Sequence, residues 1–108
     1  MLPRPHRLSR EADFKRILGG KRINSEHFSI RFIKNDLNLC RFAIIISGRL
    51  VKKATKRNYI KRVVREVFRK RLESVKRGYD IIILLSKGIK DPNYNTIDNE
   101  ISPLVNKI

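Results

Sequence analysis

The stretch SGRLVKKATKRNYIKRVVREVFR, residues 47–69, predicts the central helix of this protein. At 100° per residue its apolar side chains form one stripe, and its polar and cationic side chains gather on another arc. The stripe consists of Ile60, Val63, Val64, Val67 and Phe68, and the arc of Asn58, Lys61, Arg62, Arg65 and Arg69. We therefore expect a helix over residues 56–73 that buries one face in a core and turns the other toward a polyanion.

The cationic arc lacks the acidic side chains that usually balance such a surface. Residues 49–71 hold eleven Lys or Arg and a single acid, Glu66. Like charges at Lys61, Arg65 and Arg69 stand four residues apart, which opposes helix formation by a few tenths of a kcal/mol per pair. Phosphates would relieve this repulsion, because Lys and Arg bind them with release of counterions. The basic loop 49–53 adds the backbone N–H groups of a helix N-terminus.

The composition restricts the class of protein. A chain of 108 residues holds one domain, residues 1–108, with one modest core. Its 26 Lys and Arg against 10 Asp and Glu leave a net charge of +16, for which nucleic acid is the commonest partner and an anionic membrane surface the rival. The longest strongly apolar runs, residues 43–46 and 81–85, are too short to span a bilayer. With no signal-peptide stretch and a single cysteine, we expect a cytoplasmic protein without membrane attachment.

The remaining elements follow from side-chain periodicity. Ser9 resembles an N-cap, and apolar residues at helical spacing predict a helix over 9–18 that ends at Gly19 and Gly20. Residues 27–33 alternate like a strand with one face in the core. Residues 41–47 and 79–86 are apolar strands, the first expected at the centre of the sheet, and residues 94–106 form a closing helix. A strand, a helix and a strand in the middle imply a parallel crossover in an α+β sandwich.

Catalysis by the chain itself is not expected. His6 and His27 have no identifiable second partner for acid–base work, and the carboxylates and Cys40 lack metal-ligand spacing. We predict no catalytic residue and no metal ligand, and we expect Asp80 to cap or pair locally with a basic residue.

A second binding surface is suggested by a few side chains outside the basic helix. Single-stranded bases stack on apolar surface, and a shallow groove could form between the first helix and the strand at 27–33. Its candidate residues are Phe14, Leu18, Ser29 and Arg31, with a place in the core as the alternative for the Phe14 ring, as for most aromatic residues of the chain. For Tyr59, stacking or phosphate contact and simple packing at the helix start remain open.

The run KRNYIKRVVRE at residues 56–66 resembles the Arg-Asn-Arg signature of the bacterial ribonuclease P protein component. The resemblance extends over about residues 2–104, because LP at 2–3, RL at 7–8, DF at 13–14, RF at 41–42 and GYD at 78–80 follow in the family's order. Tyr59 departs from the signature's second arginine. Gly48 and Arg49 replace a common lysine pair, Val51 occupies a usual glycine, and the loop is one residue longer.

The resemblance implies a fold and a function. The fold is a small, mostly antiparallel four-stranded sheet packed with three helices in the order α-β-β-β-α-β-α, with an unusual left-handed β-α-β crossover. The partners are the catalytic RNA of ribonuclease P, whose Mg²⁺-dependent hydrolysis removes the 5′ leader of precursor tRNA, and the precursor itself. No small-molecule substrate is implied, and Mg²⁺ would be bound mainly by the RNA.

The resemblance also assigns residues to each partner. The catalytic RNA would contact Arg57, Asn58, Lys61, Arg62 and Arg65, to which their position adds Lys52, Lys53, Lys56 and Arg69. The leader would occupy the groove of Phe14, Leu18, Ser29 and Arg31. Three rivals stay open: a ribosomal or general RNA-binding protein, a duplex-DNA reader that uses the basic helix in the major groove, and a stand-alone nuclease.

Overall fold

The structure, a computed structural model, describes residues 11–35, 40–71 and 78–108, and side chains from residue 14 onward within them. The elements are α1 (Glu11–Leu18), β1 (Lys21–Asn24), β2 (Phe28–Lys34), β3 (Arg41–Ile45), α2 (Ala54–Arg71), β4 (Tyr79–Leu85) and α3 (Tyr94–Val105). This order confirms the predicted α-β-β-β-α-β-α arrangement. The expected N-cap at residue 9 and the end of the basic helix at residue 73 lie outside the described residues.

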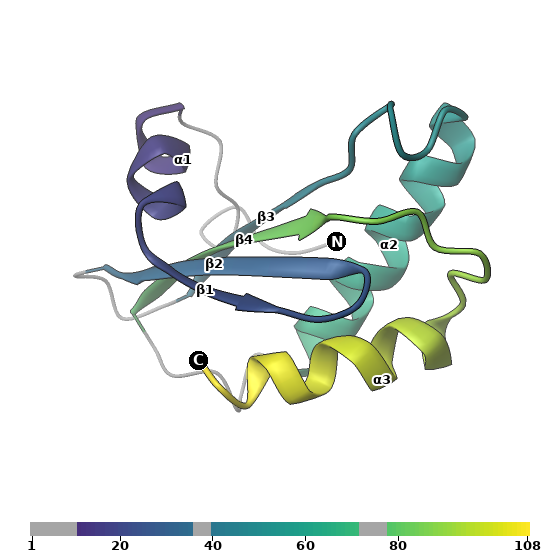
Figure 1. The fold of residues 1–108 in the computed structure, drawn as a ribbon. Helices are drawn as coiled ribbons and strands as arrows, with labels where there is room; N and C mark the ends of the chain where they lie inside the picture. The colour runs from purple at the N-terminus through teal and green to yellow at the C-terminus, as the bar shows by residue number, and fades with distance from the viewer. Residues whose placement is uncertain (1–10, 36–39, 72–77) are drawn as a thin grey trace.

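The sheet is mixed, with strand order β1-β2-β4-β3. The pairs β1–β2 and β2–β4 are antiparallel, whereas β3 and β4 are parallel. Because α2 joins these two parallel neighbours, the predicted crossover is confirmed, and this is the connection for which the family resemblance implies a left hand. Figure 1 shows α1 on one face of the sheet and α2 and α3 on the other.

The expected central position of residues 41–47 is wrong. β3 is an edge strand, and β4 lies between β2 and β3. The apolar run in β3 has another cause: Phe42 packs toward α2, with its ring centroid 5.1 Å from that of Phe68, while Ile45 remains 40% exposed. The apolar sequence of β3 therefore predicted burial of both faces, whereas in the fold one face of this strand is partly exposed.

The main core fills the space between the sheet and the two helices α2 and α3. The predicted stripe of α2, Ile60, Val63, Val64, Val67 and Phe68, is buried throughout. It meets alternate residues of β2 and β4, and burial of each such side chain contributes roughly 1.5–3 kcal/mol. These strand residues are Phe28, Ile30, Phe32, Ile81, Ile83 and Leu85.

A smaller cluster holds α1 on the opposite face of the sheet. Ile17 of α1 and Ile82 of β4 are both fully buried, and Phe14, Ile33, Ala43 and Leu84 pack against them in part. The connection from α1 to β1 needs a glycine, because a Cβ at Gly20 would stand 2.5 Å from the carbonyl oxygen of Phe32. Among the described residues no helix is both long enough and apolar enough to cross a membrane.

Candidate nucleic-acid interface

The predicted cationic side chains of α2 and the loop before it form one surface, which we call the basic surface. Six of its residues are exposed: Lys52, Lys53, Lys56, Asn58, Arg62 and Arg69. The other three, Arg57, Lys61 and Arg65, are half-buried. Five of them, Asn58, Lys61, Arg62, Arg65 and Arg69, share the side of α2 opposite its buried stripe, while Lys52 and Lys53 precede the helix and Lys56 and Arg57 lie in its first turn.

Arg57 has a structural role at the start of α2. Its Nη1 donates to the carbonyl oxygens of Val51 (2.8 Å) and Lys52 (2.9 Å), which fixes the basic loop against the helix. Val51, which departs from the family's usual glycine, is 5% exposed and belongs to the main core. The loop is therefore anchored by the burial of Val51 and by the Arg57 side chain, and Lys52 and Lys53 are held next to the helix N-terminus.

The charges along α2 are only partly balanced within the chain. Arg69 forms an ion pair with Glu66, and the hydrogen bond from this guanidinium lowers the pKa of the Glu66 carboxyl. By contrast, Lys61, Arg62 and Arg65 form no ion pair with any residue in the described ranges. Tyr59, near the start of α2, is 42% exposed.

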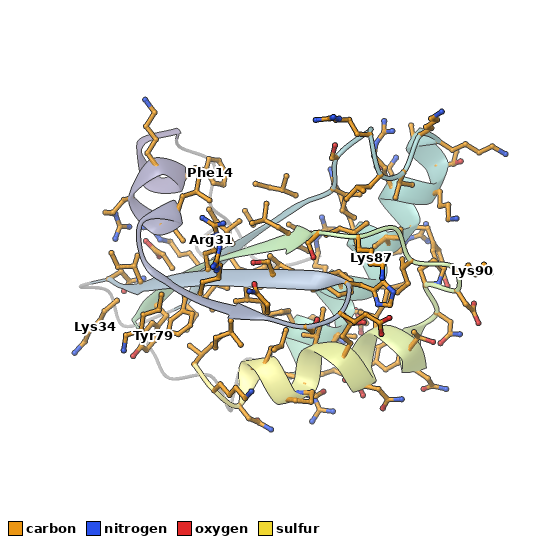
Figure 2. All side chains as sticks on the ribbon, in the orientation of Figure 1. Phe14, Arg31, Lys34, Tyr79, Lys87 and Lys90 are labelled. Atoms are coloured by element: carbon orange, nitrogen blue, oxygen red, sulfur yellow. The ribbon has the colours of Figure 1, made fainter. Side chains whose placement is uncertain are left out.

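The second predicted surface lies on the side of the sheet that carries α1, which we call the α1 face. Arg31 donates from Nη1 to the carbonyl oxygen of Leu18, 3.2 Å away, and Figure 2 shows its side chain rising from β2 toward the helix that carries Phe14. Leu18 is 42% exposed. Ser29 is 9% exposed and its Oγ donates to Oδ1 of Asn24 (2.7 Å), so its hydroxyl proton is engaged inside the β1–β2 hairpin.

Arg22 is a residue of this face that the sequence reasoning missed. It is the cross-strand partner of Arg31 in the β1–β2 register. Like charges directly opposite each other destabilise a sheet, and the Nε of Arg31 is buried without a hydrogen-bond partner. The arrangement creates a local excess of positive charge beside exposed apolar surface. The sequence signal was faint, since KRIN at residues 21–24 has one apolar residue and shows no strand pattern.

Asp80 fixes α1 over the sheet. Its carboxylate is fully buried and accepts hydrogen bonds from Arg41 (Nε 2.9 Å, Nη2 2.7 Å), from Asn35 (2.7 Å) and from Arg16 of α1. Burial raises the pKa of this carboxyl, but the hydrogen bonds from Arg41, Asn35 and Arg16 lower it to below its ordinary value. The expected local pairing is thus corrected, because the partners are 39 to 64 residues away in the sequence.

Glu100 of α3 provides the partner of His27 that the sequence did not reveal. Its Oε2 lies 2.9 Å from Nδ1 of His27, and its Oε1 accepts from the Ser25 hydroxyl and from the His27 backbone N–H. Burial raises the pKa of Glu100, but these hydrogen bonds lower it below its ordinary value. The cluster ties the β1–β2 hairpin to α3. Among the described residues there is no group of three or more His, Cys, Asp or Glu side chains that could hold a metal ion.

The α+β fold with a basic helix across one side of its sheet defines a small protein suited to bind a polyanion. The Ribonuclease P family model matches residues 2–108. The Ribonuclease P protein component of Microcystis aeruginosa is 33% identical over 111 residues, which cover 98% of this chain and 92% of that one.

Two solved structures share the fold. The RNase P protein from Thermotoga maritima has a TM-score of 0.82 at 30% identity and covers 94% of this chain and 96% of its own. The Staphylococcus aureus RNase P protein has a TM-score of 0.83 at 30% identity, with 94% and 93% covered. The chain therefore belongs to the family of ribonuclease P protein components, the protein subunits of a tRNA-processing ribonuclease.

Proposed function

We propose that this chain assists the catalytic RNA of ribonuclease P in the cytoplasm by binding that RNA through the basic surface and the 5′ leader of precursor tRNA on the α1 face. The observation that carries the proposal is the presence of two cationic surfaces separated by the sheet. α2 packs on one face of the sheet and α1 on the other (Figure 1), and Arg31 is on the α1 side, where it donates to the carbonyl oxygen of Leu18. One protein of this size could therefore contact both RNAs at once.

The basic surface suits a structured RNA backbone. Lys61, Arg62 and Arg65 lack ion pairs within the described chain, so phosphates can neutralise them without first breaking an intramolecular contact. Each phosphate contact adds to the affinity and to its salt dependence. Arg57 holds the loop through backbone carbonyls, which preorganises Lys52 and Lys53 and lowers the ordering cost of binding.

The α1 face suits a single strand. Arg22 and Arg31 offer positive charge, while Phe14, Leu18 and Ile45 offer apolar surface on which unpaired bases can stack. This combination tolerates many base sequences, because every base has an apolar face and every nucleotide a phosphate. Leader binding here would raise the affinity for the precursor over mature tRNA.

The chemical step belongs, in this proposal, to the RNA. In this proposal the Mg²⁺ ions that activate water are held mainly by the RNA. The protein's cations would replace part of the Mg²⁺ that otherwise screens RNA phosphates. The ribozyme would then work at a lower Mg²⁺ concentration.

The test is cleavage of a 5′-extended precursor tRNA by bacterial ribonuclease P RNA at low Mg²⁺, with and without this protein, beside a protein-only reaction. We expect stimulation that requires the ribozyme. Tight RNA binding without stimulation would replace the proposal with general RNA binding, and cleavage by the protein alone would place an active site in this chain.

Two variants separate the surfaces and serve as controls for each other. Arg65→Ala should weaken binding to the catalytic RNA whether or not the substrate has a leader. Arg31→Gln should weaken binding of leader-bearing precursor and leave binding to mature tRNA and to the catalytic RNA unchanged. Identical effects of both variants on all three ligands would contradict the assignment of two separate surfaces.

A further inference from the structure

A pocket of about 520 Å³ lies beneath β1, at the edge of the sheet and beside the C-terminal end of α3. Its walls carry three cations, Lys21, Arg22 and Lys107, and an apolar part formed by Ile23, Phe32 and Tyr79. The two rings pack edge to face with centroids 5.7 Å apart. Ile108 completes the lining, and no Asp or Glu side chain contributes to it.

The chemistry of these walls selects an anion that also has a flat apolar part. None of the three cations forms an ion pair with a residue in the described ranges, so their mutual repulsion is not relieved there. Both aromatic residues line the pocket, Phe32 with 6% exposure and Tyr79 half-buried. A nucleotide meets both requirements, with its phosphate near the lysines and its base against the ring.

The pocket is continuous with the α1 face through β1. Arg22 lines the pocket and is also the register partner of Arg31 on the α1 face. Its neighbours Lys21 and Ile23 pair with Phe32 and Ile30, whose side chains point to the other face of the sheet. Figure 2 shows Arg31 and Tyr79 on opposite sides of the sheet. β1 therefore separates two cationic, partly apolar surfaces by the width of one strand.

We propose that the single-stranded leader continues from the α1 face over β1 and places one of its nucleotides in this pocket. The proposal rests on the proposed function, in which the α1 face holds the leader. The phosphate is held between Lys21 and Lys107, and the base packs against Tyr79. Arg22 contacts the strand where it crosses the edge of the sheet.

The test measures the affinity of the reconstituted ribonucleoprotein for precursor tRNAs with a graded series of leader lengths. The variant Lys21→Ala/Lys107→Ala removes two exposed cations of the pocket. The matched control Lys87→Ala/Lys90→Ala removes two exposed lysines at the opposite end of the sheet (Figure 2). Tyr79→Leu, which keeps an apolar side chain but removes the ring, provides an independent variant.

With the unchanged protein we expect affinity to rise with leader length until the pocket is reached. The variant Lys21→Ala/Lys107→Ala should lose the final gain in affinity, so that precursors with long leaders bind with the affinity of those whose leaders stop short of the pocket. For long leaders alone, the slope of log affinity against log salt should fall by about 0.7, since the two lysines hold one phosphate and each phosphate contact to a single strand contributes about 0.7. Tyr79→Leu should weaken long-leader binding about fivefold or more. The control variant Lys87→Ala/Lys90→Ala should change the affinity by the same factor at every leader length.

Three outcomes would overturn the inference. An unchanged final gain in affinity in both pocket variants would mean that no leader nucleotide enters the pocket. An equal loss at every leader length would mean that the pocket contacts the catalytic RNA or mature tRNA instead. If the unchanged protein shows no dependence on leader length, the proposed function of the α1 face fails as well, which distinguishes that failure from failure of the pocket alone.

Discussion

Replacement of Asp80 by Asn tests whether one buried carboxylate holds α1 on the sheet. The substitution keeps the shape of the side chain but puts an NH₂ group where an oxygen accepts hydrogen bonds. Both carboxylate oxygens are used, one by Asn35 and Arg41 and the other by Arg41 and Arg16. In either orientation, the NH₂ group of the new amide therefore faces N–H donors of Arg41 and of either Asn35 or Arg16.

The size of the effect follows from the burial of the three charged groups. Breaking a buried ion pair from one side costs about 3–5 kcal/mol. The Asp80 side chain is 0% exposed, but those of Arg16 and Arg41 are 39% and 24% exposed, so water can solvate part of each guanidinium. We therefore expect a loss near the lower end, about 3 kcal/mol of unfolding free energy.

Urea unfolding at pH 7 measures this loss. With a urea m-value of about 1–3 kcal/mol/M, the midpoint should fall by about 1–3 M. Glu66→Gln is the matched control, because it also removes one negative charge but from an exposed pair, and it should leave the midpoint unchanged. Equal midpoints for Asp80→Asn and the unchanged protein would refute the reasoning.

The pH dependence distinguishes charge from shape. Because the folded-state pKa of Asp80 is lowered, its contribution is complete above the unfolded pKa of about 3.9 and is lost as the pH falls through the folded value. The difference in unfolding free energy between the unchanged protein and Asp80→Asn should become smaller as the pH falls over that range. A difference that persists at acid pH would mean that the amide perturbs packing and that the charge contributes little.

Three further results are expected. Arg65→Ala should reduce the slope of log affinity for the catalytic RNA against log salt by about one, as a filter-binding salt series would measure, and an unchanged slope would remove it from the interface. Glu100→Gln should cost about 1–3 kcal/mol in urea unfolding, and because the folded pKa is lowered, this difference should be present above about pH 4.3 and shrink at lower pH. Gly20→Ala should cost about 1–3 kcal/mol of unfolding free energy, since its Cβ would approach a backbone oxygen to 2.5 Å, and an unaffected thermal midpoint would contradict the close packing of β1.

The elements with strong periodicity were predictable from the sequence alone. The stripe of α2 predicted its buried residues because the helical repeat turns every third or fourth side chain to the same side. Strands β2 and β4 were located within one residue at each end, since one alternates and the other is uniformly apolar. Local pattern is sufficient where a segment meets the core along its whole length.

The failures share a physical cause, which is that they depend on long-range neighbours. β1 has one apolar residue and is a strand because β2 offers it a paired edge, and β3 lies at an edge because the crossover places β4 inside. The partners of Asp80 and Glu100 are set by tertiary packing across 39 to 75 residues. Arg22 was missed for the same reason, since its role at the α1 face depends on Arg31, its cross-strand partner.

The few acids of this chain explain how so basic a protein can still fold. The described carboxylates of Asp80, Glu100 and Asp98 each join separate elements: α1 and β3 to β4, the β1–β2 hairpin to α3, and α2 to α3 through Arg71. These three carboxylates thus place negative charge at joints between elements, where partial burial strengthens each contact. The cations of the basic surface and of β1 are left to face outward with little internal compensation. The described part of the chain consequently combines ion pairs between its elements with a cationic exterior, and this division, more than the net charge of +16, supports the RNA binding on two sides that we propose.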